Sequence, residues 1–381
     1  MSLLNTLGNS QLPITLQSGD GPLLWDDQGN EYWDFYGGHA VTLIGNSHPK
    51  LTEAISKQAQ QLSFCTTISD LGIRQIAAQK LCEFTGTDVA WFVNSGAEAN
   101  EGALKMARKH TGRPVIVAMV KGFHGRTMGA LGATWKYRET HYPIHGDTRF
   151  VPFGDAAALT EAMDDTVAAV IVEPIQGVSG IIEPPEGYLQ EVAEICKTNG
   201  SLLICDEVQS GMGRSGVPLL SKAMGVKADL ITLGKGLAGG FPASAVLMSQ
   251  EIADGIKPGE HGSTFGGAPL ACAAILSTLD IIQSENLMQK ALQFESTLRR
   301  HLNIEGVVEI RGKGAWIGVE LCCPAKPIAQ ALLEKGVFVG TTGQPNTLRL
   351  APPACMPEEG IIALKENLEL LLASISKNGA A

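Results

Sequence analysis

The segment DLITLGKG (Asp229–Gly236) decides the fold that we expect for this chain of 381 residues. A short apolar run, Leu230–Leu233, is followed at once by a lysine between two glycines. Such a run is typical of a strand that is buried on both faces of a parallel sheet. Glycine lets a bulky group approach the backbone, and burial lowers the pKa of a lysine toward the nucleophilic amine. We therefore predict a reactive Lys235 at a strand end, because a lysine in a surface turn would not need the apolar strand before it.

Similar apolar runs recur along the chain and alternate with helical stretches such as Ala97–His110. These further strands are expected at Val89–Val93, Val115–Val120, Val167–Val172, Leu202–Cys205 and Ala243–Met248. The alternation predicts an α/β fold with a mostly parallel sheet that carries helices on both faces. Ligands of such sheets bind beyond the carboxyl ends of the strands.

The pattern of the sequence changes near residue 265, where a smaller α+β domain is expected to begin. We expect a long helical region, two short strands and two further helices, at Ala268–Leu302, Val307–Arg311, Trp316–Leu321, Ile328–Lys335 and Pro357–Ser374. Near the start, Leu23–Trp25 and Tyr32–Phe35 read as a hairpin around Asp26–Asn30. We predict an N-terminal segment at 1–50 that joins the small domain, a large domain at 51–265 and a small C-terminal domain at 266–381.

Composition and charge argue against several classes of protein. The net charge of −10 argues against a nucleic-acid or anionic-membrane partner. The eight cysteines form no C-x-x-C pair and the histidines no H-E-x-x-H motif, so a metal site is not expected. Met1–Leu16 lacks the pattern of a signal peptide, and no apolar stretch reaches about 18 residues. We expect a cytoplasmic protein without a membrane partner.

Two further strand ends are candidates for chemistry. In NSGAEAN (94–100), small residues open a helix whose free N–H groups suit a phosphate, although this motif taken alone favours Ser95 as an ordinary N-cap. In LICDEVQ (203–209), Asp206 follows an apolar strand. Its carboxylate could keep a pyridinium nitrogen protonated, or it could serve a structural salt bridge or a metal.

The glycines at 234, 236 and 239 fit the dinucleotide-binding fingerprint G-x-G-x-x-G. That fingerprint must open a helix, whereas the residues after Gly240 lead into the strand expected at Ala243–Met248. We therefore reject an NAD site.

Six ordered motifs together resemble one family. They are NSGAEAN (94–100), FHGRT (123–127), VEPIQG (172–177), DEVQSGMGRSG (206–216), TLGKG (232–236) and HGSTFGG (261–267). The chain is similar to class III pyridoxal-phosphate aminotransferases, and within them most to acetylornithine and succinylornithine aminotransferases. The opening LLWDDQGNEYWDF and the later IRGKGAWIGVEL and LRLAPP extend the resemblance over nearly the whole chain.

The resemblance implies the pyridoxal-phosphate transferase fold and a cofactor, pyridoxal 5'-phosphate, that is carried on Lys235. Lys235 would also move the proton, and Asp206 would pair with the pyridinium nitrogen. The implied ring contacts are Phe123 and Val208 on the two faces and Gln209 near the phenolic oxygen. The implied phosphate contacts are Ser95, Gly96 and Ala97 of one subunit with Thr264 of the partner subunit, so the resemblance implies a homodimer with shared sites.

The same resemblance implies the substrate contacts. Ser263 would lie near the substrate, Arg126 would bind a substrate carboxylate, and Arg349 would receive the α-carboxylate of glutamate. A guanidinium binds a carboxylate through two parallel hydrogen bonds, although either arginine could instead form a structural ion pair. Many relatives place a glutamate after VEPIQG that masks the second arginine, and this chain has Val178 there. We hypothesise that Val178 changes the handling of donors that lack an α-carboxylate near the reacting amine.

We therefore expect a transaminase that moves the ω-amino group of an acylornithine-like donor, first N-acetylornithine, to 2-oxoglutarate, giving glutamate and a semialdehyde. Other donors stay open, among them succinylornithine, ornithine, 4-aminobutyrate and an aminoadipate-pathway donor on a LysW-type carrier. An aminomutase or decarboxylase on the same fold is the nearest alternative. A non-catalytic binding protein is disfavoured, because it would not need Lys235, Asp206 and Arg126 together. His39 lies where relatives place varied residues near the substrate tail. A lone histidine is more often structural, so both roles for it stay open.

Overall fold

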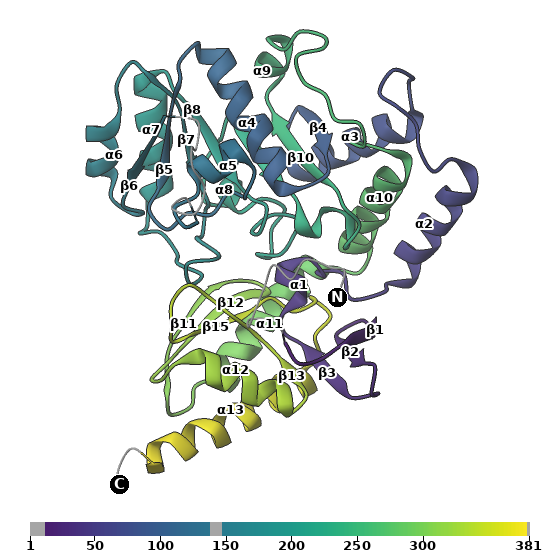
Figure 1. Cartoon of the computed structure of the whole chain (residues 1–381), viewed down its shortest axis with the longest axis vertical. Coiled ribbons are helices and arrows are strands. Elements are labelled where there is room, and N and C mark those ends of the chain that lie inside the picture. Colours follow the sequence, from purple (N-terminus) through teal and green to yellow (C-terminus); the bar gives the residue numbers. More distant parts are fainter. Residues whose placement is uncertain (1–11, 138–146, 379–381) are drawn as a thin grey trace.

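The computed structural model describes residues 12–137 and 147–378, and its centre is a seven-stranded sheet (Figure 1). In hydrogen-bonded order its strands are β4 (Val89–Val93), β10 (Ser244–Met248), β9 (Leu230–Leu233), β8 (Leu202–Asp206), β7 (Val167–Val172), β5 (Val115–Met119) and β6 (Thr148–Val151). Only β10 runs antiparallel to its neighbours within this sheet. The predicted mostly parallel sheet is confirmed, and so is the strand that excluded the dinucleotide fingerprint.

Strand β6 was not predicted, and its short, partly polar sequence explains why. It pairs only with β5 at the edge of the sheet, and three of its four residues are half-buried. The strand has only four residues and begins with the polar Thr148 and Arg149, so its sequence lacks the apolar run that marks the others. Arg149 in this strand donates a hydrogen bond to the carbonyl oxygen of Ala162 at 2.7 Å.

Helices cover both faces of the large sheet. The side chains of β5 show this, because successive residues belong to the core clusters on opposite faces. Ile116 and Ala118 belong to a core cluster with the small apolar residues of α4, whereas Val115, Val117 and Met119 belong to the opposite cluster with α3, α7 and α10. The helices of this part are α2 (Pro49–Gln61), α3 (Gly72–Thr85), α4 (Gly96–Thr111), α5 (Met128–Ala133), α6 (Ala156–Ala162), α7 (Tyr188–Asn199), α8 (Leu220–Ala223), α9 (Gln250–Asp254) and α10 (Pro269–Ser284). Two-sided burial explains why the central strands are apolar throughout.

Two smaller sheets lie together beneath the large one in Figure 1. One contains β1 (Leu16–Asp20), β2 (Leu23–Asp26), β3 (Glu31–Asp34) and β13 (Val337–Phe338), and the other contains β11 (Val307–Lys313), β12 (Trp316–Leu321), β15 (Thr347–Leu350) and β14 (Gly340–Thr341). Strand β13 pairs with β3, so the N-terminal hairpin is hydrogen-bonded to the C-terminal third of the chain. The domain boundaries at residues 50 and 265 stay a prediction.

The helical region expected at Ala268–Leu302 is divided into two helices. They are α10, which ends at Ser284, and α11 (Leu287–His301). Asn286 between them has a φ of 54°, a left-handed conformation that asparagine adopts more readily than most residues. The remaining helices, α12 (Ala325–Glu334) and α13 (Glu358–Asn378), lie near their predicted positions. Over the described ranges, none of the helices is both long and apolar enough to cross a membrane.

Candidate active site

Three strand ends meet at one edge of the large sheet, as the sequence predicted. Ser95 follows β4, Asp206 ends β8, and Lys235 follows β9 after Gly234. A Cβ atom on Gly96 would lie only 2.8 Å from a methyl group of Val208, and one on Gly234 would lie 3.4 Å from the Cα atom of Gly96. The glycines therefore allow the three segments to approach closely, and they leave no room for a side chain between them.

The carboxylate of Asp206 is buried and accepts several hydrogen bonds. His124 Nδ1 and Asn100 Nδ2 each lie 2.8 Å from its Oδ2 atom, and the N–H of Val208 donates to Oδ1 at 3.0 Å. Asn100 is in turn fixed by the hydroxyl of Thr232, which donates to its Oδ1 atom at 2.7 Å. Burial alone would raise the pKa of Asp206, but the hydrogen bond and charge of His124 and the charge of Lys235 outweigh it and lower that pKa. The carboxylate is held ionised and in one orientation.

The sequence predictions did not single out Asn100, His124 or Glu173, which surround the predicted residues. The Glu173 carboxylate is buried and accepts hydrogen bonds from the N–H groups of Phe123 at 2.9 Å and Gly177 at 3.1 Å. Desolvation raises the pKa of Glu173 to about 7. Asn100, His124 and Glu173 each lie inside one of the motifs quoted above. A polar residue in the same motif as a predicted contact is the sequence signal that could have identified them. By contrast, Glu207 beside Asp206 is structural, because its carboxylate accepts four hydrogen bonds from Ser210, Leu220 and Ser221.

Lys235 occupies a strained position at the centre of these groups. Its φ of 44° lies in the left-handed region, where a residue other than glycine is uncommon. Such strain clusters at functional sites. Desolvation, followed by the charge of Arg349, lowers the pKa of Lys235 to about 8, although Asp206 and Glu173 act in the opposite direction. At mildly alkaline pH, Lys235 is therefore a neutral amine in a large fraction of the protein molecules.

The N-terminus of α4 has the N-cap considered for it and is compatible with an anion. The Ser95 hydroxyl accepts a hydrogen bond from the N–H of Glu98 at 3.2 Å, so Ser95 is the N-cap of a 16-residue helix. The N–H groups of Gly96 and Ala97, in the first turn, have no partner within the helix. They can donate to an anion that lies at this end of the helix, where the dipole also favours negative charge.

The two predicted arginines have different surroundings. Arg126 is exposed, and its guanidinium lies over the rings of Phe123 at 5.8 Å and Tyr137 at 5.0 Å. Arg349, in β15, is buried, and its Nη2 atom donates a hydrogen bond to Gln209 Oε1 at 2.7 Å. No carboxylate forms a salt bridge with either guanidinium in the described parts of the chain. The structural ion pair that was considered for each arginine is absent there.

The loop that carries Ser263 and Thr264 crosses the end of β4. Asn94 Nδ2 donates a hydrogen bond to Ser263 Oγ at 3.0 Å, which holds this loop beside the start of α4. Thr264 is exposed on the protomer, and so is the ring of Phe265 next to it.

His39 lies on a left-handed turn, α1 (Gly37–Ala40), in which four successive residues have a positive φ. The Tyr36 hydroxyl lies 2.7 Å from Nδ1 and 2.5 Å from Nε2 of the imidazole, so it can bond to either nitrogen. Desolvation, together with the charges of Arg349, Lys235 and Arg126, lowers the pKa of His39 to about 4. The imidazole is therefore uncharged near neutral pH.

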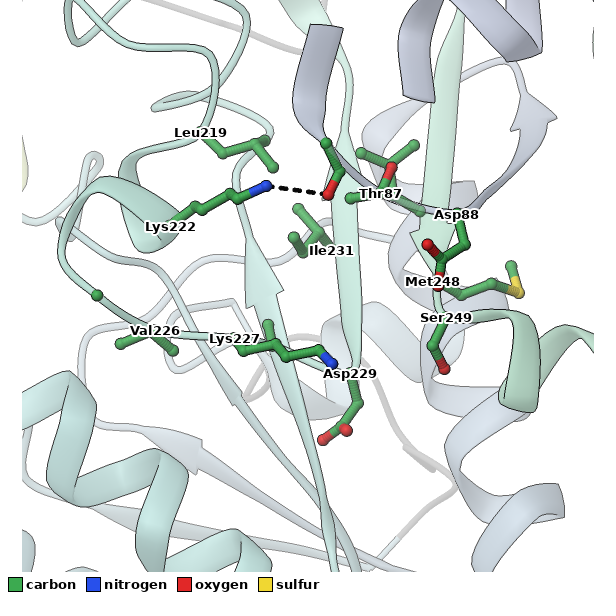
Figure 2. A pocket seen from close by; sticks show the side chains of 14 residues that line it. Thr87, Asp88, Leu219, Lys222, Val226, Lys227, Asp229, Ile231, Met248 and Ser249 are labelled. Carbon is green, nitrogen blue, oxygen red and sulfur yellow. Dashed lines mark hydrogen bonds between the residues drawn. The ribbon is translucent and has the colours of Figure 1, made fainter. Parts of the chain in front are cut away.

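A cavity of about 460 Å³ opens at the opposite edge of the sheet (Figure 2). Three of its four charged lining groups, Lys222, Asp229 and Asp88, have structural partners, and the fourth is Lys227. Lys222 donates to the carbonyl oxygens of Thr85 and Gly86, and Asp229 accepts from the N–H of Leu203. Asp88 accepts a hydrogen bond from the N–H of Gln250. None of the predicted site residues lines this cavity, so we do not assign the chemistry to it. Elsewhere in the described chain, no cluster of three or more histidine, cysteine or acidic side chains is arranged to hold a metal ion.

Comparisons with known proteins agree with the resemblance read from the motifs. The family model described as aminotransferase class-III matches residues 6–372. The acetylornithine aminotransferase of Methanothermobacter thermautotrophicus is 40% identical over 370 residues, which are 95% of this chain and 95% of that protein. The one from Methanopyrus kandleri is 45% identical over 318 residues, 82% of each chain. The solved structure of ornithine aminotransferase from Toxoplasma gondii ME49 has a TM-score of 0.90 at 32% identity and covers 97% of this chain and 93% of its own.

The lowered pKa of Lys235 predicts a selective reactivity. In the ligand-free protein, acylation of Lys235 by an activated ester should rise with pH and reach half its maximum near pH 8, because only the neutral amine reacts. The exposed lysines of the same protein serve as the comparison. Peptide mass spectrometry over a pH series measures both, and a Lys235 profile that coincides with that of the exposed lysines would contradict the lowered pKa.

The close approach at Gly96 predicts a cost for any side chain there. Gly96→Ala should lower the free energy of unfolding by about 1–3 kcal/mol, because the stiff Val208 side chain must move. Gly72→Ala is the matched control, since an added Cβ at Gly72 meets nothing within 4 Å. Urea unfolding measures both variants, and equal stabilities would show that the packing at Gly96 is looser than described.

Proposed function

The chain belongs to the class-III aminotransferase family, and we propose that it transfers the ω-amino group of N-acetylornithine to 2-oxoglutarate. The products are glutamate and the semialdehyde of the donor. The observation that carries the proposal is the meeting of Lys235 with the ionised Asp206 at one sheet edge, with two arginines beside them. The relatives named acetylornithine aminotransferase, similar over most of the chain, supply the donor.

The enzyme depends on pyridoxal 5'-phosphate, and the described residues fit that group. The bound cofactor supplies an electron sink that makes the carbon next to the reacting nitrogen acidic. Asp206 is ionised and rigidly held, as a partner for a protonated ring nitrogen requires. The first turn of α4, with Ser95, Gly96 and Ala97, would hold the phosphate. Phe123 and Val208 would pack on the ring faces, and Gln209 would lie near the phenolic oxygen.

Lys235 would hold the cofactor and also act on a proton. An amine with a pKa of about 8 can accept a proton from carbon and return it at a different carbon without a large free-energy cost near working pH. Its fixed position after β9 places this acid and base next to Asp206 and Arg349, whose charges act on its pKa. In the proposed reaction the same amine serves both half-reactions.

The two arginines would select the substrates. Arg126, exposed above two aromatic rings, would bind the carboxylate of the acylornithine, and Ser263 would lie near this substrate. Arg349 would bind the α-carboxylate of glutamate or 2-oxoglutarate. Ornithine is the second candidate donor, because a solved ornithine aminotransferase has the same fold over 97% of this chain.

The proposal includes a homodimer in which Thr264 of the partner subunit reaches the phosphate. Thr264 is exposed beside Phe265, whose ring is 60% exposed and lies 5.4 Å from the exposed ring of Phe64. Ile68, on the same loop as Phe64, is 95% exposed. Large apolar side chains gathered on a surface are typical of an interface. All eight cysteines are free, which favours the cytoplasm as the compartment.

The donor is tested by a half-reaction without an oxo acid. N-acetylornithine should convert the cofactor to its amino form, seen as loss of the long-wavelength absorbance, and 2-oxoglutarate should restore it. Succinylornithine, ornithine and 4-aminobutyrate are compared at equal concentration. A hydrophobic pocket discriminates between substrates that differ by one methylene by only about 10–200-fold, so more than one donor can respond. A response only to 4-aminobutyrate would keep the transaminase and discard the acylornithine donor. If no donor responds, the aminomutase and decarboxylase alternatives take its place.

The shared site is tested by mixing two inactive variants. Lys235→Ala should lose at least about 10²–10⁴-fold in turnover, and Thr264→Glu should lose activity because its carboxylate repels the phosphate. A mixed dimer then contains one site with Lys235 and a partner Thr264, so mixing under subunit exchange should restore activity. Each variant exchanged with itself is the control. Continued inactivity of the verified mixed dimer would mean that Thr264 acts within its own subunit.

A further inference from the structure

Arg349 is a buried cation whose direct polar partner is neutral. Its exposed fraction is 5%, and Nη2 donates to Oε1 of Gln209, which is 6% exposed, at 2.7 Å. The arginine only donates, so the amide oxygen of Gln209 must face it and the amide nitrogen must face elsewhere. The Nε atom of Arg349 is buried and has no hydrogen-bond partner in the described parts of the chain. One donor of this guanidinium therefore has no partner in the described parts of the chain.

A buried guanidinium without a counter-charge is costly, and a glutamine does not remove that cost. Desolvation lowers the pKa of Arg349, and only the more distant groups Tyr36 and Glu173 favour its charged form. A carboxylate that enters the site would supply both the missing charge and acceptors for the free donor. The resemblance implies that many relatives place a masking glutamate after VEPIQG, and this chain has Val178 there, whose side chain cannot form an ion pair.

The neighbouring residues fix Gln209 in this position. A Cβ atom on Gly177 would lie 2.6 Å from its Nε2 atom and 2.7 Å from its Oε1 atom, so the amide lies directly against the backbone there. The same Cβ would also lie 2.7 Å from the ring of Trp316 in β12. Arg349 is held from its own side, because β15 pairs with both β12 and β14. The hydrogen bond thus joins the residues that follow β8 to the C-terminal sheet.

We propose that Gln209 is a positioning residue for Arg349, which orients the guanidinium for a substrate carboxylate without competing for its charge. The proposal rests on the proposed function, in which Arg349 receives the α-carboxylate of glutamate or 2-oxoglutarate and Gln209 lies near the cofactor ring. Because one glutamine serves both, the binding of a carboxylate at Arg349 also changes the surroundings of the cofactor. A five-carbon dicarboxylate binds directly, since no ion pair has to be broken first.

The experiment uses glutarate, a dicarboxylate with neither an amine nor an oxo group, so that binding is separated from reaction. The holoenzyme is titrated with glutarate by calorimetry, and the absorption spectrum of the cofactor is recorded in parallel. We expect saturable binding together with a shift of the spectrum. Failure of glutarate to bind the native enzyme would overturn the proposal.

Val178→Glu adds a competing carboxylate and should weaken glutarate binding by about 10- to 100-fold, the range expected for a hydrogen bond to a charged group. Val178→Gln has nearly the same size without the charge, and its affinity should stay close to that of the native enzyme. Equal affinities in the glutamate and glutamine variants would contradict the neutral arrangement around Arg349.

Gln209→Leu removes the amide and should weaken glutarate binding and abolish the spectral shift that glutarate causes. Gln344→Leu is the matched control, because Gln344 accepts a hydrogen bond from Arg311 at 3.2 Å in the same part of the molecule. It should leave both the affinity and the shift unchanged. A shift that persists in Gln209→Leu refutes the link to the cofactor. The native half-reaction with N-acetylornithine tests the proposed function separately.

Discussion

The buried carboxylate of Asp206 is the constraint on which the rest of the site depends. An ionised group inside a protein needs hydrogen-bond donors, and here they come from separate elements. Asn100 lies on α4, His124 follows β5, and the N–H of Val208 belongs to the segment after β8. The hydrogen bonds to this one carboxylate therefore hold the start of α4 against the ends of β5 and β8. In the proposed function, the same arrangement provides the surface that would hold the phosphate and the planar ring.

The charges around Lys235 form one balanced group. Burial and the cation of Arg349 favour the neutral lysine, whereas the acids Asp206 and Glu173 favour the charged one. The outcome is an amine with a pKa of about 8, which can both attack a carbonyl group and exchange protons. His39 stays uncharged beside these cations near neutral pH. In the proposed function, Arg126 and Arg349 supply the positive charge for the carboxylates of substrates.

Much of the fold could be predicted because it depends on local patterns. A strand that is covered by helices on both faces needs an apolar residue at nearly every position, and such runs are visible at Val167–Val172 and Leu230–Leu233. Strand β6 and the break at Asn286 were missed. An edge strand tolerates polar residues, and one asparagine in a left-handed conformation leaves the helical pattern on either side unchanged.

The sequence by itself determined the sheet, the family and the residue types at the strand ends, since these are written in short motifs. It did not determine which residue pairs with which. His124 and Asp206 are 82 positions apart and Gln209 and Arg349 are 140 apart, so only the folded chain brings them within hydrogen-bonding distance. A motif can show that an arginine is present. Whether its partner is a carboxylate or a neutral amide depends on how distant segments pack. Burial makes each unpaired polar group costly, so the group pairs with whichever partner the folded chain brings within reach.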